Sequence, residues 1–129
     1  MSDRVLLLED DDDLATITDA LVSGAGYEVV RASSVEDAIA VCESAEPNVA
    51  LVDVQLPSRS GWDFVREAAR WPDMRVVVYT VHHDEPETVE RAARLKVDAV
   101  VGKSTDPMRI VDVIRSFDHG LLKNKAETP

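Results

Sequence analysis

The sequence predicts a single α/β domain with a doubly wound parallel sheet, and three observations support this prediction. First, short unbroken apolar runs such as Val49–Val52 recur along the chain; they are too short for helices and lack the polar alternation of half-exposed strands. Second, stretches with apolar residues at helical spacing lie between these runs. Third, a chain of 129 residues can bury one full core but not two. Five strands alternating with five helices through right-handed crossovers then place helices on both faces of the sheet.

The composition of the chain excludes several classes of partner. The chain has 25 acidic and 14 basic residues and a net charge of -11, which repels nucleic acid phosphates and anionic membranes and favours cationic or metal partners. We therefore expect no direct nucleic acid binding and no membrane binding by this domain. The single cysteine, Cys42, allows no internal disulfide, and no apolar run is long enough for a membrane span or a signal peptide. These features favour a cytoplasmic location.

The first part of the chain predicts two strands and two helices. Val5–Leu8 is a buried strand that runs directly into the acidic stretch Glu9–Asp13. Glycines end the helix that follows, and its inward residues at helical spacing are Leu14, Ile17 and Leu21. Charged residues bracket the apolar pair in Tyr27–Arg31, which fits an edge strand. Ser33–Glu36 matches a capping box for the next helix, whose inward residues are Val35, Ala38, Ile39 and Cys42.

The third strand, Val49–Asp53, is the centre of the predicted sheet. It ends in Asp53 and is followed by a loop to Gly61 that is rich in loop-forming residues. Ser60 is the predicted N-cap of the next helix, because a serine hydroxyl can accept a free amide of the first turn. The apolar residues of this helix are Phe64, Val65, Ala68 and Ala69.

The last part of the chain predicts two further strands and two further helices. Val76–Tyr79 is a buried strand that closes on Thr80, and Pro86 opens a charged helix that runs to about Lys96. Ala99–Val101 is the fifth strand. Asp106-Pro107 starts the last helix, whose inward residues are Ile110, Val113, Ile114 and Phe117. We expect residues 1–118 to form the domain and residues 119–129 to be a C-terminal tail or linker.

Polar groups end four of the five predicted strands, and parallel strands bring their carboxyl ends to one edge of the sheet. These groups are Glu9 and Asp10, Asp53, Thr80 and Lys103. Converging carboxylates repel one another by about 4 kcal/mol per close pair, so a positive partner is needed. Mg²⁺ suits carboxylates, waters and phosphate oxygens. Together with a lysine and a hydroxyl, the set fits phosphoryl transfer, in which the Asp53 carboxylate becomes an aspartyl phosphate.

The sequence resembles the receiver domains of bacterial two-component response regulators. The resemblance covers about Arg4 to Phe117, and its motifs are the acidic run Leu6–Asp11, Asp53 with Pro57 and Gly61, Thr80, and Lys103. It implies a flavodoxin-like strand order, 2-1-3-4-5. The segments Trp71-Pro72-Asp73 and Asp106-Pro107 look like those of receivers that precede a DNA-binding helix-turn-helix.

The resemblance also implies a function for the predicted site. Asp53 would accept a phosphoryl group from a histidine kinase or phosphotransfer protein, and Thr80 and Lys103 would pass the change to a binding face. Mg²⁺ would be held directly by Asp10, Asp53 and the backbone carbonyl of Gln55, and through water by Glu9. Such a domain is not an enzyme in the usual sense, but a phosphoacceptor that assists its own phosphorylation and dephosphorylation.

Several residues depart from the receiver pattern. Val100 stands three residues before Lys103, where receivers commonly have Tyr or Phe, Val81 follows Thr80 where a small residue is usual, and Ser104 replaces a frequent proline. Val81 and Val100 motivate an alternative function, a receiver-like interaction module that is not phosphorylated. A phosphatase of the haloacid dehalogenase type is disfavoured, because it needs a second Asp where this chain has Gln55.

Three other features have weaker functional interpretations. Gly102-Lys103-Ser104 is similar to the end of a phosphate-binding P-loop, but that motif requires a glycine where the chain has Val97. The run His82–Glu85 fits a solvated loop better than a metal site, because adjacent side chains in a loop diverge. On the last helix, Met108 and Val111 are predicted to be exposed, either as ordinary surface or as part of a homodimer interface through the fourth and fifth helices.

Overall fold

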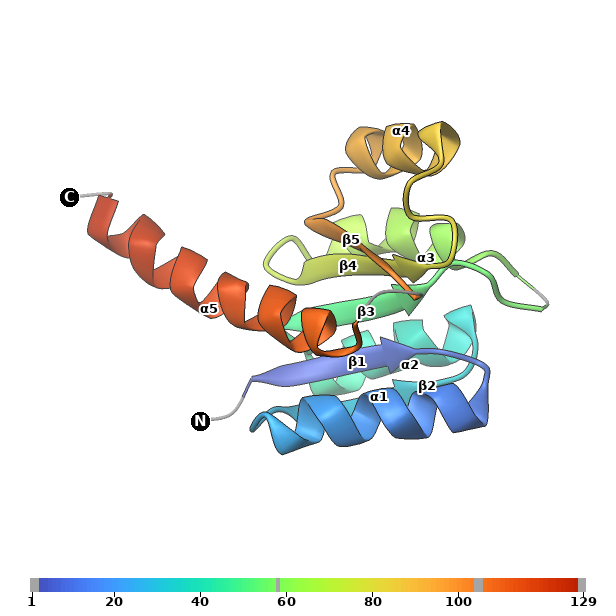
Figure 1. Cartoon of the computed structure of the whole chain (residues 1–129), viewed down its shortest axis with the longest axis horizontal. Coiled ribbons are helices and arrows are strands. Elements are labelled where there is room, and N and C mark those ends of the chain that lie inside the picture. The colour runs from blue at the N-terminus through green and yellow to red at the C-terminus, as the bar shows by residue number, and fades with distance from the viewer. Residues whose placement is uncertain (1–2, 58, 104–105, 128–129) are drawn as a thin grey trace.

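The fold is a five-stranded parallel sheet between two layers of helices. The computed structural model describes residues 3–57, 59–103 and 106–127, and side chains up to residue 117. The strands are β1 (Arg4–Leu8), β2 (Glu28–Ala32), β3 (Val49–Asp53), β4 (Arg75–Thr80) and β5 (Ala99–Gly102), in the order β2-β1-β3-β4-β5 (Figure 1). The helices are α1 (Asp12–Gly24), α2 (Val35–Ala45), α3 (Gly61–Glu67) with a 3-10 turn η1 (Ala68–Arg70), α4 (Pro86–Arg94) and α5 (Met108–Glu127). The predicted fold class and strand order are confirmed.

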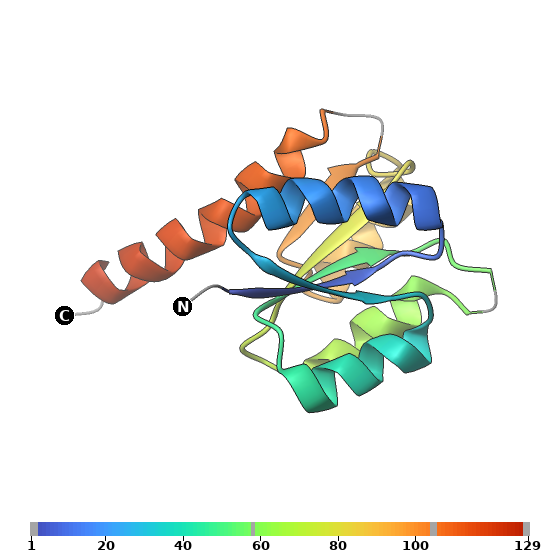
Figure 2. The same cartoon turned by 90° about the horizontal axis from the view of Figure 1, so that it is seen from below.

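The helices cover the two faces of the sheet unequally. Figure 2 shows α1 and α5 on one face and α2 and α3 on the other. Each face has its own apolar cluster, one with Leu7, Leu51 and Ile114, the other with Leu6, Val52 and Phe64. Helix α4 is held much less firmly, because Ala92 is its only buried residue. No helix within the described ranges is long and apolar enough to cross a bilayer.

Burial in the sheet follows the strand order. All five residues of β3 are buried, since β3 has β1 on one side and β4 on the other and helices on both faces. The predicted edge position of the second strand is confirmed, and its charged residues Glu28 and Arg31 are exposed. Asp53 therefore ends the most fully buried strand of the sheet.

The predicted inward face of α1 is wrong by one residue. The buried residues are Ala15, Thr18 and Val22, whereas Ile17 is 56% exposed and Leu14 is only half-buried. Both sets have helical spacing, so periodicity alone did not separate them. The smaller side chains let the helix lie close to the sheet. Thr18 also makes a buried polar contact with Tyr79 of β4, which a leucine or isoleucine face would not supply.

The helix starts largely agree with the sequence. The predicted capping box at Ser33 is wrong in register: Ser34 is the N-cap of α2, and its hydroxyl accepts the Asp37 amide at 3.1 Å. Ser34 has an extended backbone conformation, as an N-cap requires. Ser60 caps α3 as predicted, accepting the Trp62 amide at 3.1 Å. Asp106 accepts the Met108 amide at 3.0 Å at the start of α5.

Helix α5 corrects the predicted surface of the last helix. Ile110 and Ile114 are buried as predicted, but Val111 is fully buried rather than exposed, while Met108 is exposed. The buried arc is wider than one stripe because α5 contacts α1 as well as β5. The helical backbone continues to Glu127, and the assignment of residues 119–129 as a tail or linker stays a prediction. Ser104 lies outside the described residues.

Candidate functional site

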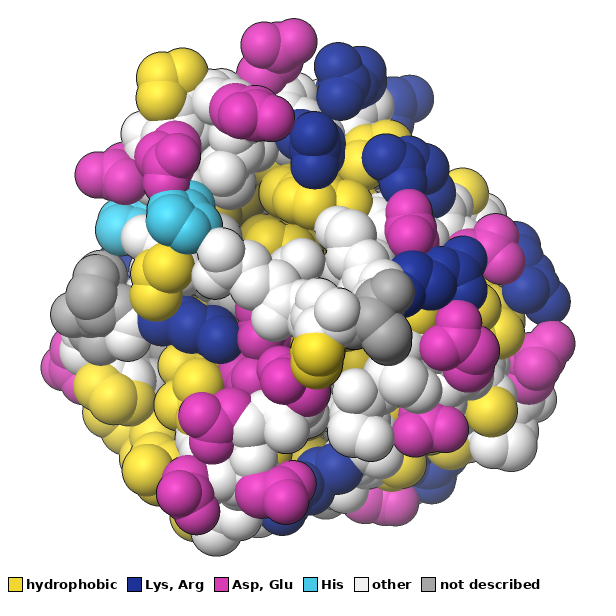
Figure 3. All heavy atoms as spheres, turned by 90° about the vertical axis from the view of Figure 1, so that its right-hand side faces the viewer, with side chains coloured by type: hydrophobic (Ala, Val, Ile, Leu, Met, Phe, Trp, Pro, Cys, Tyr) yellow, Lys and Arg dark blue, Asp and Glu magenta, His cyan; other side chains and the backbone are white. Residues whose placement is uncertain are grey.

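The carboxyl ends of the parallel strands meet on the right-hand side of Figure 1. Figure 3 looks onto this face, where acidic side chains gather near the centre beside a basic side chain. The charged and polar residues of this edge lie at or just after the ends of four strands, β1, β3, β4 and β5. These strands are consecutive neighbours in the sheet. The sheet topology thus brings together groups that are far apart in the sequence.

Asp53 is the central residue of this edge and is 2% exposed. One carboxylate oxygen, Oδ1, accepts the backbone N–H of Gln55 at 2.8 Å, and the other, Oδ2, lies 3.0 Å from the Lys103 ammonium. The loop folds back closely behind it: the Gly61 amide donates to the Val54 carbonyl at 3.1 Å. A Cβ at position 61 would lie against the Asp53 carbonyl, so only glycine fits this turn without displacing the backbone.

Two more carboxylates follow β1. Glu9 is buried, and its backbone N–H donates to the Ala32 carbonyl at 3.1 Å, which continues the pairing of β1 with β2. Asp10 is exposed. One carboxylate oxygen from each of Glu9, Asp10 and Asp53 lies within 4.8 Å of the others. The predicted convergence of the three acids is therefore present in the structure as an acidic cluster that could hold a metal ion.

Lys103, at the end of β5, is the cation of this cluster. Its ammonium lies 3.1 Å from Glu9 Oε1 and 3.0 Å from Asp53 Oδ2, with most of the side chain buried. Burial by itself would lower the pKa of Lys103, but its contacts with Asp53 and Glu9 outweigh burial and hold that pKa above its usual value. The lysine therefore stays charged.

Glu9 shows that one lysine does not neutralise two buried acids. Burial, followed by the nearby Asp53 carboxylate, raises the pKa of Glu9 from 4.5 to about 7, although Lys103 opposes the change. At neutral pH the Glu9 carboxyl is therefore protonated in a large fraction of molecules. An additional cation would relieve this repulsion.

Thr80 and Gln55 lie at the same edge. Thr80 is fully buried at the end of β4, and its hydroxyl accepts the His82 amide at 3.1 Å. Gln55 is exposed in the loop after Asp53 and contacts the carboxylate through its amide. A cavity of about 170 Å³ opens beside both residues and is also lined by Trp62 and Arg91. Val81 is exposed next to it, and Val100 is half-buried.

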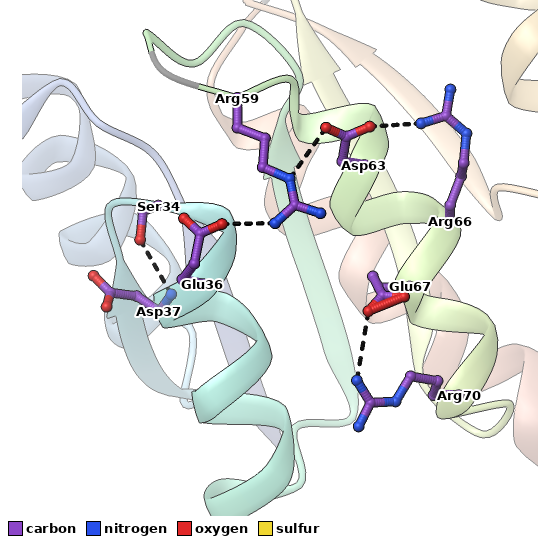
Figure 4. Close-up of polar contacts among 8 residues, drawn as sticks. All are labelled: Ser34, Glu36, Asp37, Arg59, Asp63, Arg66, Glu67 and Arg70. Carbon is purple, nitrogen blue, oxygen red and sulfur yellow. Dashed lines mark hydrogen bonds and ion pairs between the residues drawn. The ribbon is translucent and has the colours of Figure 1, made fainter.

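The loop after Asp53 is tied to the neighbouring helices by charged pairs. Figure 4 shows Arg59 between Glu36 of α2 and Asp63 of α3, with nitrogen-to-oxygen distances of 2.6 and 3.2 Å. Asp63 also pairs with Arg66 at 2.7 Å. These side chains are largely exposed, so each pair contributes little to stability. Together they fix the outer side of the loop whose inner side holds Asp53.

Sequence reasoning missed one residue of this region, Tyr79. Its ring lies under the Lys103 ammonium, with Nζ 5.2 Å from the ring centroid, and its hydroxyl makes a polar contact with Thr18. The available signal was an aromatic residue with a polar end in an otherwise aliphatic buried strand. Periodicity marked Tyr79 only as core.

Comparison with known proteins identifies the family. The model of the response regulator receiver domain matches residues 5–115. The chain belongs to the response regulator receiver domain family. Receiver domains are components of two-component systems, so the resemblance inferred from the acidic motif, Asp53, Thr80 and Lys103 is confirmed at the level of the family.

Several relatives of this receiver domain carry names of regulators. It is 26% identical over 114 residues to "Probable transcriptional regulator ycf27" of Cyanophora paradoxa, covering 88% of this chain and 47% of that protein. It is 28% identical over 85 residues to "Transcriptional regulatory protein AfsQ1" of Streptomyces coelicolor, covering 66% of this chain and 38% of that protein. The receiver domain thus spans about half or less of the length of these curated relatives.

The fold has close structural counterparts. The crystal structure of a CheY-like response regulator receiver domain protein from Methanospirillum hungatei matches with a TM-score of 0.87 and 23% identity, covering 96% of this chain and 99% of that chain. At this identity the likeness concerns the fold alone.

Proposed function

We propose that this receiver domain accepts a phosphoryl group on Asp53 from the phosphohistidine of a histidine kinase or phosphotransfer protein. The observation that carries the proposal is the environment of the Asp53 carboxylate, which is buried at a strand end, oriented by the Gln55 amide and paired with Lys103. A buried carboxylate held in this way is a candidate nucleophile rather than a surface charge. Family membership supports the same partner class.

The proposed transfer uses the chain's own groups in defined roles. An Asp53 carboxylate oxygen attacks the phosphorus atom, and an O–P bond forms as the P–N bond breaks, with the electron pair left on the imidazole nitrogen. The Lys103 ammonium neutralises charge on the transferred oxygens. The Gln55 amide holds the carboxylate in position, and the Thr80 hydroxyl donates to the phosphoryl group once it turns from the His82 amide. Thr80 and Lys103 then link the modified Asp53 to β4 and β5.

The residues present fit Mg²⁺. The carboxylate oxygens of Glu9, Asp10 and Asp53 converge within 4.8 Å, and burial followed by Asp53 raises the pKa of Glu9, an effect that a hard divalent cation would offset. We propose that Asp10, Asp53 and the Gln55 carbonyl hold the ion directly and that Glu9 holds it through water. When bound, Mg²⁺ supplies charge neutralisation at the phosphoryl oxygens.

Intact mass spectrometry tests the proposal. The domain is incubated with acetyl phosphate and Mg²⁺, and one added phosphoryl group is expected on the wild-type protein and on Asp13→Asn. Asp13 is a matched control because it is an exposed acid in the first turn of α1. Asp53→Asn should show no adduct, and EDTA should suppress the adduct on the wild type. Equal labelling of Asp53→Asn and the wild type would contradict the assignment of Asp53.

A receiver-like interaction module that is not phosphorylated is the second candidate function. Two observations favour it: the side chain that follows Thr80 is the bulky and exposed Val81, and Val100 provides no aromatic switch. If the folded wild-type domain gives no adduct with acetyl phosphate and Mg²⁺, this candidate replaces the first. The experiment above therefore decides between them.

We also propose that this domain is the receiver part of a longer transcriptional regulator, because the matched segments cover only 47% and 38% of two relatives named as transcriptional regulators. Homodimerisation through α4 and α5 belongs to the same proposal. Val89 and Met108 are exposed there, beside the paired charges Glu87–Arg91 and Glu90–Arg94. Val89→Asp combined with Met108→Asp should shift a dimer to monomer in light scattering without changing phosphorylation. A dimer unaffected by both changes would exclude this face.

A further inference from the structure

Tyr79 carries a further inference, because it is a buried phenol that follows three valines in β4. It follows Val76, Val77 and Val78 in β4 and is 5% exposed. Burying a phenol is favourable only where its polar end finds a partner. For core packing alone, a leucine or valine would serve at this position without that requirement.

Both ends of the Tyr79 side chain are engaged. The hydroxyl makes a polar contact with Thr18 of α1, itself 3% exposed, and this contact lowers the pKa of Tyr79 against the larger effect of burial. The ring lies beneath the Lys103 ammonium, with 5.2 Å between Nζ and the ring centroid. A polar partner at the hydroxyl and a cation at the ring face favour the same orientation of the ring.

Lys103 needs such a third contact. A lysine side chain has four rotatable bonds and a compact charge, so two acceptors alone do not define its position. Glu9 and Asp53 are the two acceptors, at 3.1 and 3.0 Å. The aromatic face supplies an electrostatic contact from below, and this contact is stronger than at an exposed site because most of Lys103 is buried.

We propose that Tyr79 is a positioning residue for Lys103, holding the ammonium between the two carboxylates in the place where it meets the transferred phosphoryl group. This inference rests on the proposed function of Asp53 as a phosphoacceptor. An ammonium fixed before the reaction requires less rearrangement when charge develops on the phosphoryl oxygens. The Thr18 hydroxyl makes α1 part of the same support, which gives a physical reason for the inward face of α1.

Replacement of the ring provides the test. Tyr79→Leu and Tyr79→Ile remove the aromatic face and keep an apolar side chain, and isoleucine suits a buried strand if the leucine variant does not fold. Tyr79→Phe keeps the ring and loses only the hydroxyl. Val77→Ala is the matched control, because Val77 is fully buried in the same strand and the same apolar cluster. Val77 pairs with Ala99 of β5, four residues before Lys103.

Two measurements are made on each variant. The first is the rate of Asp53 phosphorylation over a series of acetyl phosphate concentrations at saturating Mg²⁺, together with the Mg²⁺ dissociation constant from calorimetry. The second is the proton NMR shift of the Lys103 ε-methylene, which the ring current of Tyr79 displaces. The second measurement reports the contact whether or not phosphorylation occurs.

We expect the ring-free variants to phosphorylate about five-fold more slowly, as for loss of one partly desolvated cation–π contact. Their Mg²⁺ dissociation constant should stay within about two-fold, since the Tyr79 ring contacts Lys103, which is not a proposed ligand of the ion. Tyr79→Phe should recover most of the rate and keep the ring-current shift, which the ring-free variants lose. Val77→Ala should keep both the rate and the shift.

Three results would overturn the inference while leaving the proposed function intact. They are an unchanged rate in Tyr79→Leu and Tyr79→Ile, an equal loss of rate in Val77→Ala, and a Lys103 shift that does not depend on the ring. If the wild-type domain gives no adduct at Asp53, the proposed function is overturned and the positioning role with it. The two failures are therefore distinguishable.

Discussion

The buried carboxyl of Glu9 should make the stability of the domain in EDTA fall as the pH rises from about 4.5 to about 7. Its pKa is 4.5 in the unfolded chain and about 7 in the folded one, because burial and then Asp53 disfavour the charged form. Between these values the folded state holds a proton that the unfolded state has released. The stabilisation that this bound proton gives the folded state is therefore fully present below the unfolded pKa of Glu9 and is lost as the pH rises through its folded pKa.

The size of the effect follows from the two pKa values. Each pKa unit corresponds to about 1.4 kcal/mol, so the separation between 4.5 and about 7 amounts to about 3 kcal/mol of unfolding free energy across this pH range. The Glu9 side chain is 1% exposed, so solvent screening does not reduce the value much. Other acids also titrate in this range, and a comparison with a variant that cannot titrate at position 9 isolates the contribution of Glu9.

Urea unfolding at pH 5, 6, 7 and 8 in EDTA measures the effect for the wild type and for Glu9→Gln. The glutamine imitates the protonated carboxyl, so the stability of the variant should not contain the pH-dependent contribution of Glu9. Between pH 5 and pH 8 the unfolding free energy of the variant should therefore rise by up to about 3 kcal/mol relative to that of the wild type. Saturating Mg²⁺ at pH 8 should raise the stability of the wild type more than that of the variant. Parallel curves for the two proteins from pH 5 to pH 8 would refute the reasoning.

Two further predictions concern packing. Gly61→Ala should lower the unfolding free energy and the rate of Asp53 phosphorylation, because the added Cβ would meet the Asp53 carbonyl and lie 2.6 Å from the Cα of Val54. Gly24→Ala is the control, because a Cβ there would have nothing within 4 Å. It should be neutral or raise the unfolding free energy by up to about 1 kcal/mol in the same urea titration. Val111→Asp should prevent cooperative thermal unfolding, because it buries a charge, while Met108→Asp should shift the melting temperature by only a few degrees. Normal melting of Val111→Asp would contradict the burial of that side chain.

The sequence was sufficient for the sheet and for the convergence of the charged groups, for a specific physical reason. Unbroken apolar runs can be satisfied only by strands covered on both faces, and parallel strands leave no choice about where their ends lie. The positions of Glu9, Asp53 and Lys103 follow from these two facts. The distances between them do not, because they depend on register and side-chain rotamers.

The errors occurred where two neighbouring faces of a helix were both plausible. Ile17 and Val111 were misplaced because apolar periodicity defines a stripe, whereas burial depends on what packs against the helix. On α1, a buried polar contact between Thr18 and Tyr79 decided the rotation, and no apolar pattern encodes it. On α5, contact with α1 widened the buried arc to include Val111.

The charge balance of the site favours the phosphoacceptor over the unphosphorylated module. An interaction module that is not phosphorylated needs only a stable fold. A single carboxylate paired with Lys103 would stabilise that fold as well as the observed arrangement. Here Lys103 pairs with both Glu9 and Asp53, Asp10 adds a third carboxylate to the cluster, and burial followed by Asp53 raises the pKa of Glu9 to about 7. Such a local conflict is expected where function requires it. If a divalent cation resolves the conflict, Mg²⁺ at ten times its dissociation constant should stabilise the folded domain by about 1.4 kcal/mol. If Mg²⁺ has no effect on the unfolding free energy, the surplus acids need a different explanation and the module becomes the better interpretation.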